Sequence, residues 1–145
     1  MRRFWILAVL LTTFITGCST GSSTSAEDIA KLAYEWEKAY FDTDYSKEQE
    51  LLYEPGSFEV HKSREKKDSG LKFEDIRYEI YYDNELEQYY VFTDFKSPIG
   101  SNNIKDELLI RKKGDEWKVD KSESFDIVRK DVSDKFEREA CIHCK

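Results

Sequence analysis

The spacing of apolar residues changes at Leu71, and this change restricts the fold more than any other feature of the chain. Before it, apolar residues recur every three or four positions, which is the period of an amphipathic helix. After it, apolar and polar residues alternate, as in a half-buried strand. Helices followed by consecutive strands predict the α+β class, with N-terminal helices packed on an antiparallel sheet of about four strands.

The first helix is expected to begin at Ser25, whose hydroxyl can cap the amide of Asp28. We expect it to end near residues 42–44. Its apolar face would comprise Ile29, Leu32, Ala33, Trp36, Ala39 and Tyr40. Its opposite, solvent-facing side would carry Glu35, Glu37 and Lys38. Core packing is the favoured role for the single tryptophan of this helix, and a binding role is the alternative.

A second, shorter helix is expected from Ser46 to a stop at Pro55. Residues 58–60 would form a short strand, and residues 62–70 a solvated, charged loop. His61 lies between them. An incidental surface or packing role is favoured for this histidine over catalysis.

Four strands follow, with turns at Asp83-Asn84, at residues 97–103 and at Gly114-Asp115. Their apolar faces would contain Ile76, Tyr78, Ile80 and Tyr82; Tyr89, Val91, Thr93 and Phe95; Ile104, Leu108 and Ile110; and Trp117 and Val119. We expect the last strand to run as far as Ile127 and to give way to a short C-terminal helix. Trp36 and Trp117 would both belong to the buried layer.

The order of these elements, with the closing segment LLIRKKGDEWKV (residues 108–119), resembles the nuclear-transport-factor-2-like superfamily. The resemblance covers roughly residues 26–128. It implies a curved sheet that wraps the first helix into a cone with an inner pocket. Members include isomerases, dehydratases and plain binding domains, so this fold does not by itself determine a function.

The N-terminus has the three regions of a secretory signal: Arg2 and Arg3, the apolar run from Phe4, and a small-residue close at Ile15-Thr16-Gly17-Cys18. This close resembles the lipobox of bacterial lipoproteins, which implies cleavage before Cys18 and a diacylglyceryl group on its sulfur. The alternatives are a transmembrane anchor and a buried helix with an incidental cysteine, but the apolar run is shorter than the roughly 20 residues that a span requires.

Four segments are therefore predicted: a signal peptide (residues 1–17), a lipidated Cys18 with a flexible tether (residues 18–25), an α+β domain (residues 26–136) and a C-terminal tail (residues 137–145). The tether, with the sequence STGSSTS after Cys18, has nothing to pack. We expect the mature protein on the extracytoplasmic face of the cell membrane, where two acyl chains suffice for anchoring.

The net charge of −7 becomes more negative once the two signal arginines are removed. An acidic surface is repelled by phosphate backbones, so nucleic acid is not an expected partner. Aromatic residues make up 14% of the chain, which is enough for a sizeable core despite 37% charged residues. The expected partners are the membrane, through the lipid on Cys18, and a small ligand or an envelope protein.

The C-terminal CIHC segment is the one compact chemical group in the sequence. Cys141 and Cys144 form an even pair outside the cytoplasm, which favours a local disulfide or two free thiols. A thioredoxin-like site would need a helix to follow, and a zinc site would need a fourth ligand. Neither a metal nor a cofactor is expected, and we expect the tail to contribute little to the fold.

Trp36, Tyr78, Tyr82 and Asp94 are the candidate residues for a pocket or an interface. Asp94 with Tyr78 or Tyr82 could imitate the Asp/Tyr proton transfer of pocket enzymes that resemble this chain. The favoured function is a small binding domain, with no catalytic residue assigned. The alternatives are a pocket enzyme of the same fold and a structural partner in envelope assembly.

Overall fold

Ser25 caps the first helix, α1 (Ala26–Asp42), in the computed structural model, which describes residues 24–145. The Asp28 amide donates to the Ser25 hydroxyl at 3.1 Å, and the Ser25 amide donates to the Asp28 carboxylate at 3.0 Å. These bonds satisfy amides that have no partner inside the helix. The helix ends at Thr43, which adopts a left-handed conformation (φ 53°). The predicted start and end are confirmed.

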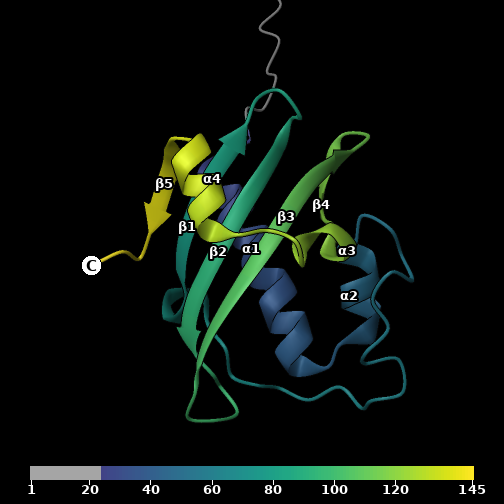
Figure 1. Cartoon of the computed structure of the whole chain (residues 1–145). Helices are drawn as coiled ribbons and strands as arrows, with labels where there is room; N and C mark the ends of the chain where they lie inside the picture. The colour runs from purple at the N-terminus through teal and green to yellow at the C-terminus, as the bar shows by residue number, and fades with distance from the viewer. Residues whose placement is uncertain (1–23) are drawn as a thin grey trace, which may run out of the picture.

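Five antiparallel strands form one open sheet, in the order β4-β3-β2-β1-β5. They are β1 (Arg77–Asp83), β2 (Gln88–Lys96), β3 (Asn103–Lys113), β4 (Glu116–Val119) and β5 (Arg138–Ile142). The α+β class is confirmed, and the alternation predicted for the first four strands matches their pairing. The sheet has one strand more than expected (Figure 1).

Helices cover both faces of this sheet. The inner face carries α1 and α2 (Tyr45–Leu51), and the outer face carries α4 (Arg129–Lys135), as Figure 1 shows. Two short helices complete the described chain: η1 (Phe73–Asp75) precedes β1, and α3 (Lys121–Ser124) follows β4. The protein is therefore three layers deep, with a large core on one side of the sheet and a smaller one on the other.

The inner core lies between α1, α2 and alternate residues of the strands. Its fully buried members include Trp36, Tyr78, Ile80, Val91, Leu108, Ile110 and Val119. The smaller outer cluster is built on Tyr81, Phe92 and Val132, with Tyr90, Ile127 and Phe136 packed against it. Trp117 is only half-buried, against the Tyr89 ring, so the expectation of a buried Trp117 is corrected.

Two predicted strand segments are absent from the described part of the chain. Residues 58–60 are irregular, because Gln49 holds this loop by donating to the Phe58 carbonyl at 2.8 Å. The last predicted strand stops at Val119 rather than near Ile127. The reason is Asp120, whose carboxylate accepts the Glu123 amide at 3.3 Å and so begins a helical turn.

The prediction that residues 137–145 form a tail outside the domain is wrong. Their strand β5 pairs with β1, with Ile142 opposite Tyr78 and Ala140 opposite Ile80. The strand covers an edge of β1 that would otherwise present unpaired backbone groups. Arg138 adds an ion pair to Glu79 at 3.8 Å. The C-terminal segment is thus an edge strand of the sheet.

We predict that Trp36→Ala lowers the free energy of unfolding by about 3–5 kcal/mol, because it removes a fully buried ring and leaves a cavity. Trp36→Phe should cost clearly less, since it keeps an aromatic ring and removes an indole N–H that has no hydrogen-bond partner among residues 24–145. Urea unfolding of the two variants measures the difference. Equal losses would contradict the packing described for this ring.

Candidate functional site

A pocket of about 450 Å³ opens where α1 meets the first residues of β3. Its wall is rich in aromatic side chains, with a few charged groups among them. The lining residues are Glu37, Tyr40, Phe41, Phe58, Val60, Ile104, Lys105, Asp106, Lys121 and Phe125. Phe125 is 73% exposed, so a large apolar side chain faces solvent at the opening of the pocket. We call this the Glu37 pocket.

Glu37 is the deepest charged residue of the pocket, with only 2% of its surface exposed. The Thr93 hydroxyl of β2 donates to its Oε1 atom at 2.8 Å. Burial raises the pKa of this carboxyl to about 8, and the nearby Asp106 carboxylate adds to the rise. Glu37 is therefore largely protonated at pH 7, and a neutral carboxyl group can donate a hydrogen bond as well as accept one.

The expectation that Glu37 faces solvent is wrong. Ala30, Ala33, Glu37 and Phe41 are all buried, at spacings of three and four residues, so together they form the stripe of α1 that faces the sheet. Phe41 packs edge-on against Phe95 of β2, which places this stripe directly on the strand. The two alanines on the same stripe were the sequence signal that could have identified Glu37 as buried.

Asp106 and Lys121 close the wall of the Glu37 pocket opposite α1. The Lys121 ammonium lies 2.9 Å from both carboxylate oxygens of Asp106, and the Lys121 side chain is largely buried. This ion pair is on the inner face because Asp106 pairs in register with Thr93. The paired charges leave the Glu37 carboxyl as the group available to a ligand.

A second pocket, of about 540 Å³, adjoins the first and shares Tyr40, Phe41, Val60 and Ile104 with it. We call it the His61 pocket. His61 Nδ1 lies 2.6 Å from Glu48 Oε1, and both side chains are buried. Burial raises the pKa of Glu48, whose Oε2 atom has no hydrogen-bond partner within the described residues. His61 is therefore not a surface residue; its burial against Tyr40 and Phe58 agrees with the packing role that was the other expectation.

The sequence-predicted site residues do not come together. Trp36 and Tyr78 are fully buried in the core, and Tyr82 packs on Tyr89 at the edge of the same core. Asp94 pairs in register with Arg77, whereas Tyr78 pairs with Thr93, so Asp94 lies on the outer face and Tyr78 on the inner one. An Asp94–Tyr proton-transfer pair is excluded by this alternation.

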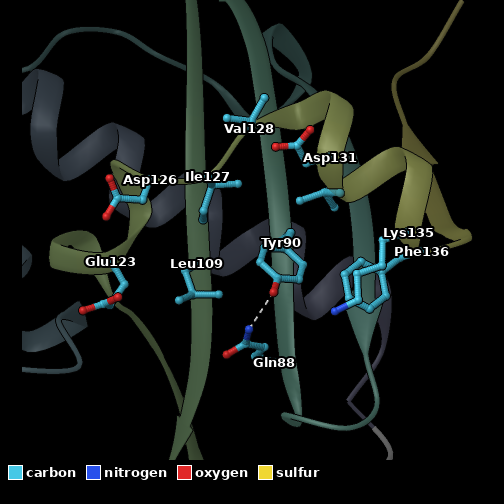
Figure 2. A pocket seen from close by; sticks show the side chains of 11 residues that line it. Gln88, Tyr90, Leu109, Glu123, Asp126, Ile127, Val128, Asp131, Lys135 and Phe136 are labelled. Atoms are coloured by element: carbon cyan, nitrogen blue, oxygen red, sulfur yellow. Dashed lines mark hydrogen bonds between the residues drawn. The ribbon is translucent and has the colours of Figure 1, made fainter.

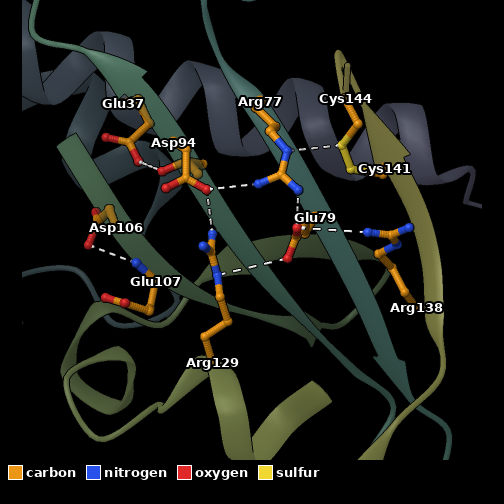
Figure 3. A network of polar contacts seen from close by, with 11 residues as sticks. Glu37, Arg77, Glu79, Asp94, Asp106, Glu107, Arg129, Arg138, Cys141 and Cys144 are labelled. Atoms are coloured by element: carbon orange, nitrogen blue, oxygen red, sulfur yellow. Dashed lines mark hydrogen bonds and ion pairs between the residues drawn. A yellow bond between two sulfur atoms is a disulfide. The ribbon is translucent and has the colours of Figure 1, made fainter. Parts of the chain in front are cut away.

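Asp94 instead belongs to a charged network on the outer face, shown in Figure 3. Arg129 of α4 contacts Asp94 at 2.7 Å, and Arg77 contacts it at 3.3 Å. Glu79 accepts from Arg77 and lies 3.8 Å from both Arg129 and Arg138. Each charge has a partner, so the network ties α4 and β5 to the sheet.

Beside this network, the segment from α3 to α4 forms an open groove of about 340 Å³ with β2 and β3 (Figure 2). Leu109, Tyr90 and Phe136 line it, and the Gln88 side chain donates to the Tyr90 hydroxyl at 2.8 Å. Carboxylates of the same segment stand on its rim. It contains no buried ionisable group, and this distinguishes it from the Glu37 and His61 pockets.

Cys141 and Cys144 are joined by a disulfide at the end of β5. The loop between them carries His143, whose Nδ1 atom lies 2.8 Å from the Ile76 carbonyl oxygen and whose ring packs on Phe73. The Arg77 Nε–H donates to Cys144 Sγ at 3.2 Å. Across residues 24–145, no group of three or more metal-ligating side chains is gathered.

The predicted signal peptide and Cys18 lie outside the described residues. Among the helices of the described part, none has the length and apolar character to cross a membrane. Comparison with known proteins found no matching family, no matching curated protein and no matching solved structure.

We predict that Glu37 makes stability depend on pH. Between its ordinary pKa of 4.5 and about 8, the folded protein holds a proton that the unfolded chain has lost. This contribution to stability is therefore full below pH 4.5, and it falls by up to about 1.4 kcal/mol per pH unit as pH rises to 8. Urea unfolding of the wild type and Glu37→Gln at pH 5, 6.5 and 8 measures it.

The glutamine variant cannot ionise and still accepts the Thr93 hydrogen bond, so its stability relative to the wild type should rise across this range. Glu35→Gln, an exposed change on the same helix, is the matched control and should follow the wild type. Parallel pH profiles for Glu37→Gln and the wild type would show that the carboxyl has an ordinary pKa.

Proposed function

We propose that this protein is a membrane-anchored, extracytoplasmic lipoprotein whose α+β domain binds a small, largely apolar ligand. The Glu37 pocket is the observation that supports ligand binding. Its volume of about 450 Å³ lies in the range of small-molecule sites. Such sites combine apolar walls with a few polar groups that orient the ligand, and this pocket has both.

The protonation state of Glu37 suggests how a ligand would be held. Thr93 already donates to Oε1, so the proton of the neutral carboxyl resides on Oε2. A ligand oxygen could accept a hydrogen bond from this O–H while the apolar body of the ligand packs against Tyr40, Phe41 and Phe58. An occupant that lacks the acceptor can still be held by the aromatic wall, but it should bind more weakly than one that offers an oxygen, because it would leave the buried donor without a partner.

The anchoring part of the proposal rests on the N-terminal sequence. The ITGC close after an apolar run supports lipidation at Cys18, and the capped start of α1 at Ala26 leaves a polar segment between lipid and domain. Two acyl chains would hold the domain at the extracytoplasmic face of the cell membrane. The tether would let the pockets face away from the lipid surface.

The nuclear-transport-factor-2-like architecture also remains a proposal. Helix α1 lying across the inner face of an antiparallel sheet, with a pocket at one end, supports it. The strand β5 beside β1 is an addition that the resemblance did not include. A pocket enzyme built on Asp94 loses its support, since that carboxylate lies on the outer face.

We predict that N-phenyl-1-naphthylamine, a neutral aromatic probe, binds the wild-type domain with a rise in fluorescence. Ile104→Trp should weaken this binding about tenfold or more, because residue 104 lies on the wall between the two pockets. Leu86→Trp is the matched control at an exposed turn between β1 and β2. Val60→Trp, at an exposed position of the same wall, replaces Ile104→Trp if that variant does not fold. Equal affinity in all variants would rule out the Glu37 pocket as the binding site.

Lipidation is tested separately. Cys18→Ser should release the protein from the membrane fraction and abolish incorporation of a labelled fatty acid, because the thiol is the proposed attachment point. Ser19→Ala is the control and should change neither result. Wild-type protein that is soluble and unlabelled would overturn the lipoprotein proposal, whatever the pocket binds.

A further inference from the structure

Two cationic side chains without a carboxylate partner in the described chain, those of Arg64 and Lys67, line the His61 pocket. Two neighbouring lysines of the same loop do have carboxylate partners. Lys62 lies 2.7 Å from Glu59, and Lys66 lies 2.6 Å from Asp44. The two cations that face the pocket are thus free to meet a ligand, whereas the two that face elsewhere are already paired. In an acidic chain, this arrangement makes one wall of the pocket locally positive.

The same wall contains the buried His61–Glu48 pair, in which the position of the His61 ring is fixed. The bond from Nδ1 to Glu48 orients the imidazole. Its other nitrogen, Nε2, has no partner among residues 24–145, yet it is not one of the fully buried polar atoms that lack a partner. When the pair holds two protons, one between Glu48 and Nδ1 and one on Nε2, it is neutral overall. Nε2–H is then a donor that suits an anion.

We propose that the two adjoining pockets form one site for an amphiphilic anion, a small molecule with an apolar body and a single anionic group. The body would occupy the Glu37 pocket, and the anionic group would meet His61, Arg64 and Lys67. This proposal rests on the proposed ligand-binding function and adds the charge of the ligand to it.

The division of the site into an apolar and a cationic part supports this orientation. The residues shared by the two pockets are apolar apart from one tyrosine hydroxyl: Tyr40, Phe41, Val60 and Ile104. The apolar body of the ligand can therefore extend along them from one pocket to the other without losing hydrogen bonds. In the Glu37 pocket, Lys121 is neutralised by Asp106. Lys105, the other cation of that pocket, pairs in register with Asp94, so it belongs to the outer face of the sheet. The His61 pocket therefore has two cations that no carboxylate of the described chain pairs, and it is the expected end for the anionic group.

The test uses two probes that differ by one anionic group: N-phenyl-1-naphthylamine and its sulfonate, 8-anilinonaphthalene-1-sulfonate. The sulfonate should bind the wild-type domain about tenfold more tightly than the neutral probe and displace it. Raising the salt concentration should reduce this preference. The variant Arg64→Gln/Lys67→Gln should lose it, with neutral-probe affinity changed less than about twofold.

The variant Lys62→Gln/Lys66→Gln is the matched control. It changes the charge of the same loop by the same amount but touches neither pocket, so it should retain the preference for the sulfonate. His61→Gln should weaken sulfonate binding more than it weakens neutral-probe binding. Urea unfolding of each variant establishes that it is folded before its affinity is compared.

The outcomes separate the two proposals. If neither probe binds, the ligand-binding function itself fails. If the neutral probe binds but the sulfonate has no advantage, or if both glutamine pairs act alike, the site takes uncharged ligands and the anion proposal is overturned. Sulfonate binding that does not displace the neutral probe would place the anion elsewhere and would likewise overturn it.

Discussion

The hydrogen bond from Thr93 to the Glu37 carboxyl is the interaction on which the candidate site depends. It joins the middle of α1 to β2 inside the core, at a point where an ionised carboxylate would be costly to bury. The protein meets this cost by keeping the carboxyl protonated, with a pKa of about 8. A neutral acid at the base of an aromatic pocket is a group that a ligand can use, so one buried contact links the packing of the helix to binding.

The outer face uses charge differently. Glu79 and Asp94 are each contacted by arginines from more than one element, so the network ties α4 and β5 to the sheet. Because these charges are mutually satisfied, they have no capacity left for a ligand. The inner face, by contrast, leaves Arg64, Lys67 and His61 Nε2 without partners in the described chain. We therefore expect ligand binding at the inner pockets, whereas the outer network stabilises the fold.

Local patterns predicted most of the fold. The Ser25 cap, the apolar stripe of α1 and the alternation in the first four strands all follow from neighbouring residues, and all are found. Long-range contacts were not predictable in this way. The residues of β1 that pair with β5 lie 57 to 64 positions earlier in the chain, and the pairing of His61 with Glu48 joins an irregular loop to α2. Glu37 was misplaced because a charged residue on a helix is normally solvated, although Ala30 and Ala33 on the same stripe of the helix indicate burial.

The most direct measurement is the pKa of Glu37 itself, obtained from the carboxyl ¹³C chemical shift in labelled protein, with Glu37→Gln to assign the resonance. A value of about 8 is expected in the free domain. It should change when N-phenyl-1-naphthylamine binds, because the probe removes water from the carboxyl. A resonance that titrates near the ordinary pKa of 4.5 would contradict the protonated carboxyl. If its chemical shift also stayed the same when the probe is added, Glu37 would not belong to a ligand site.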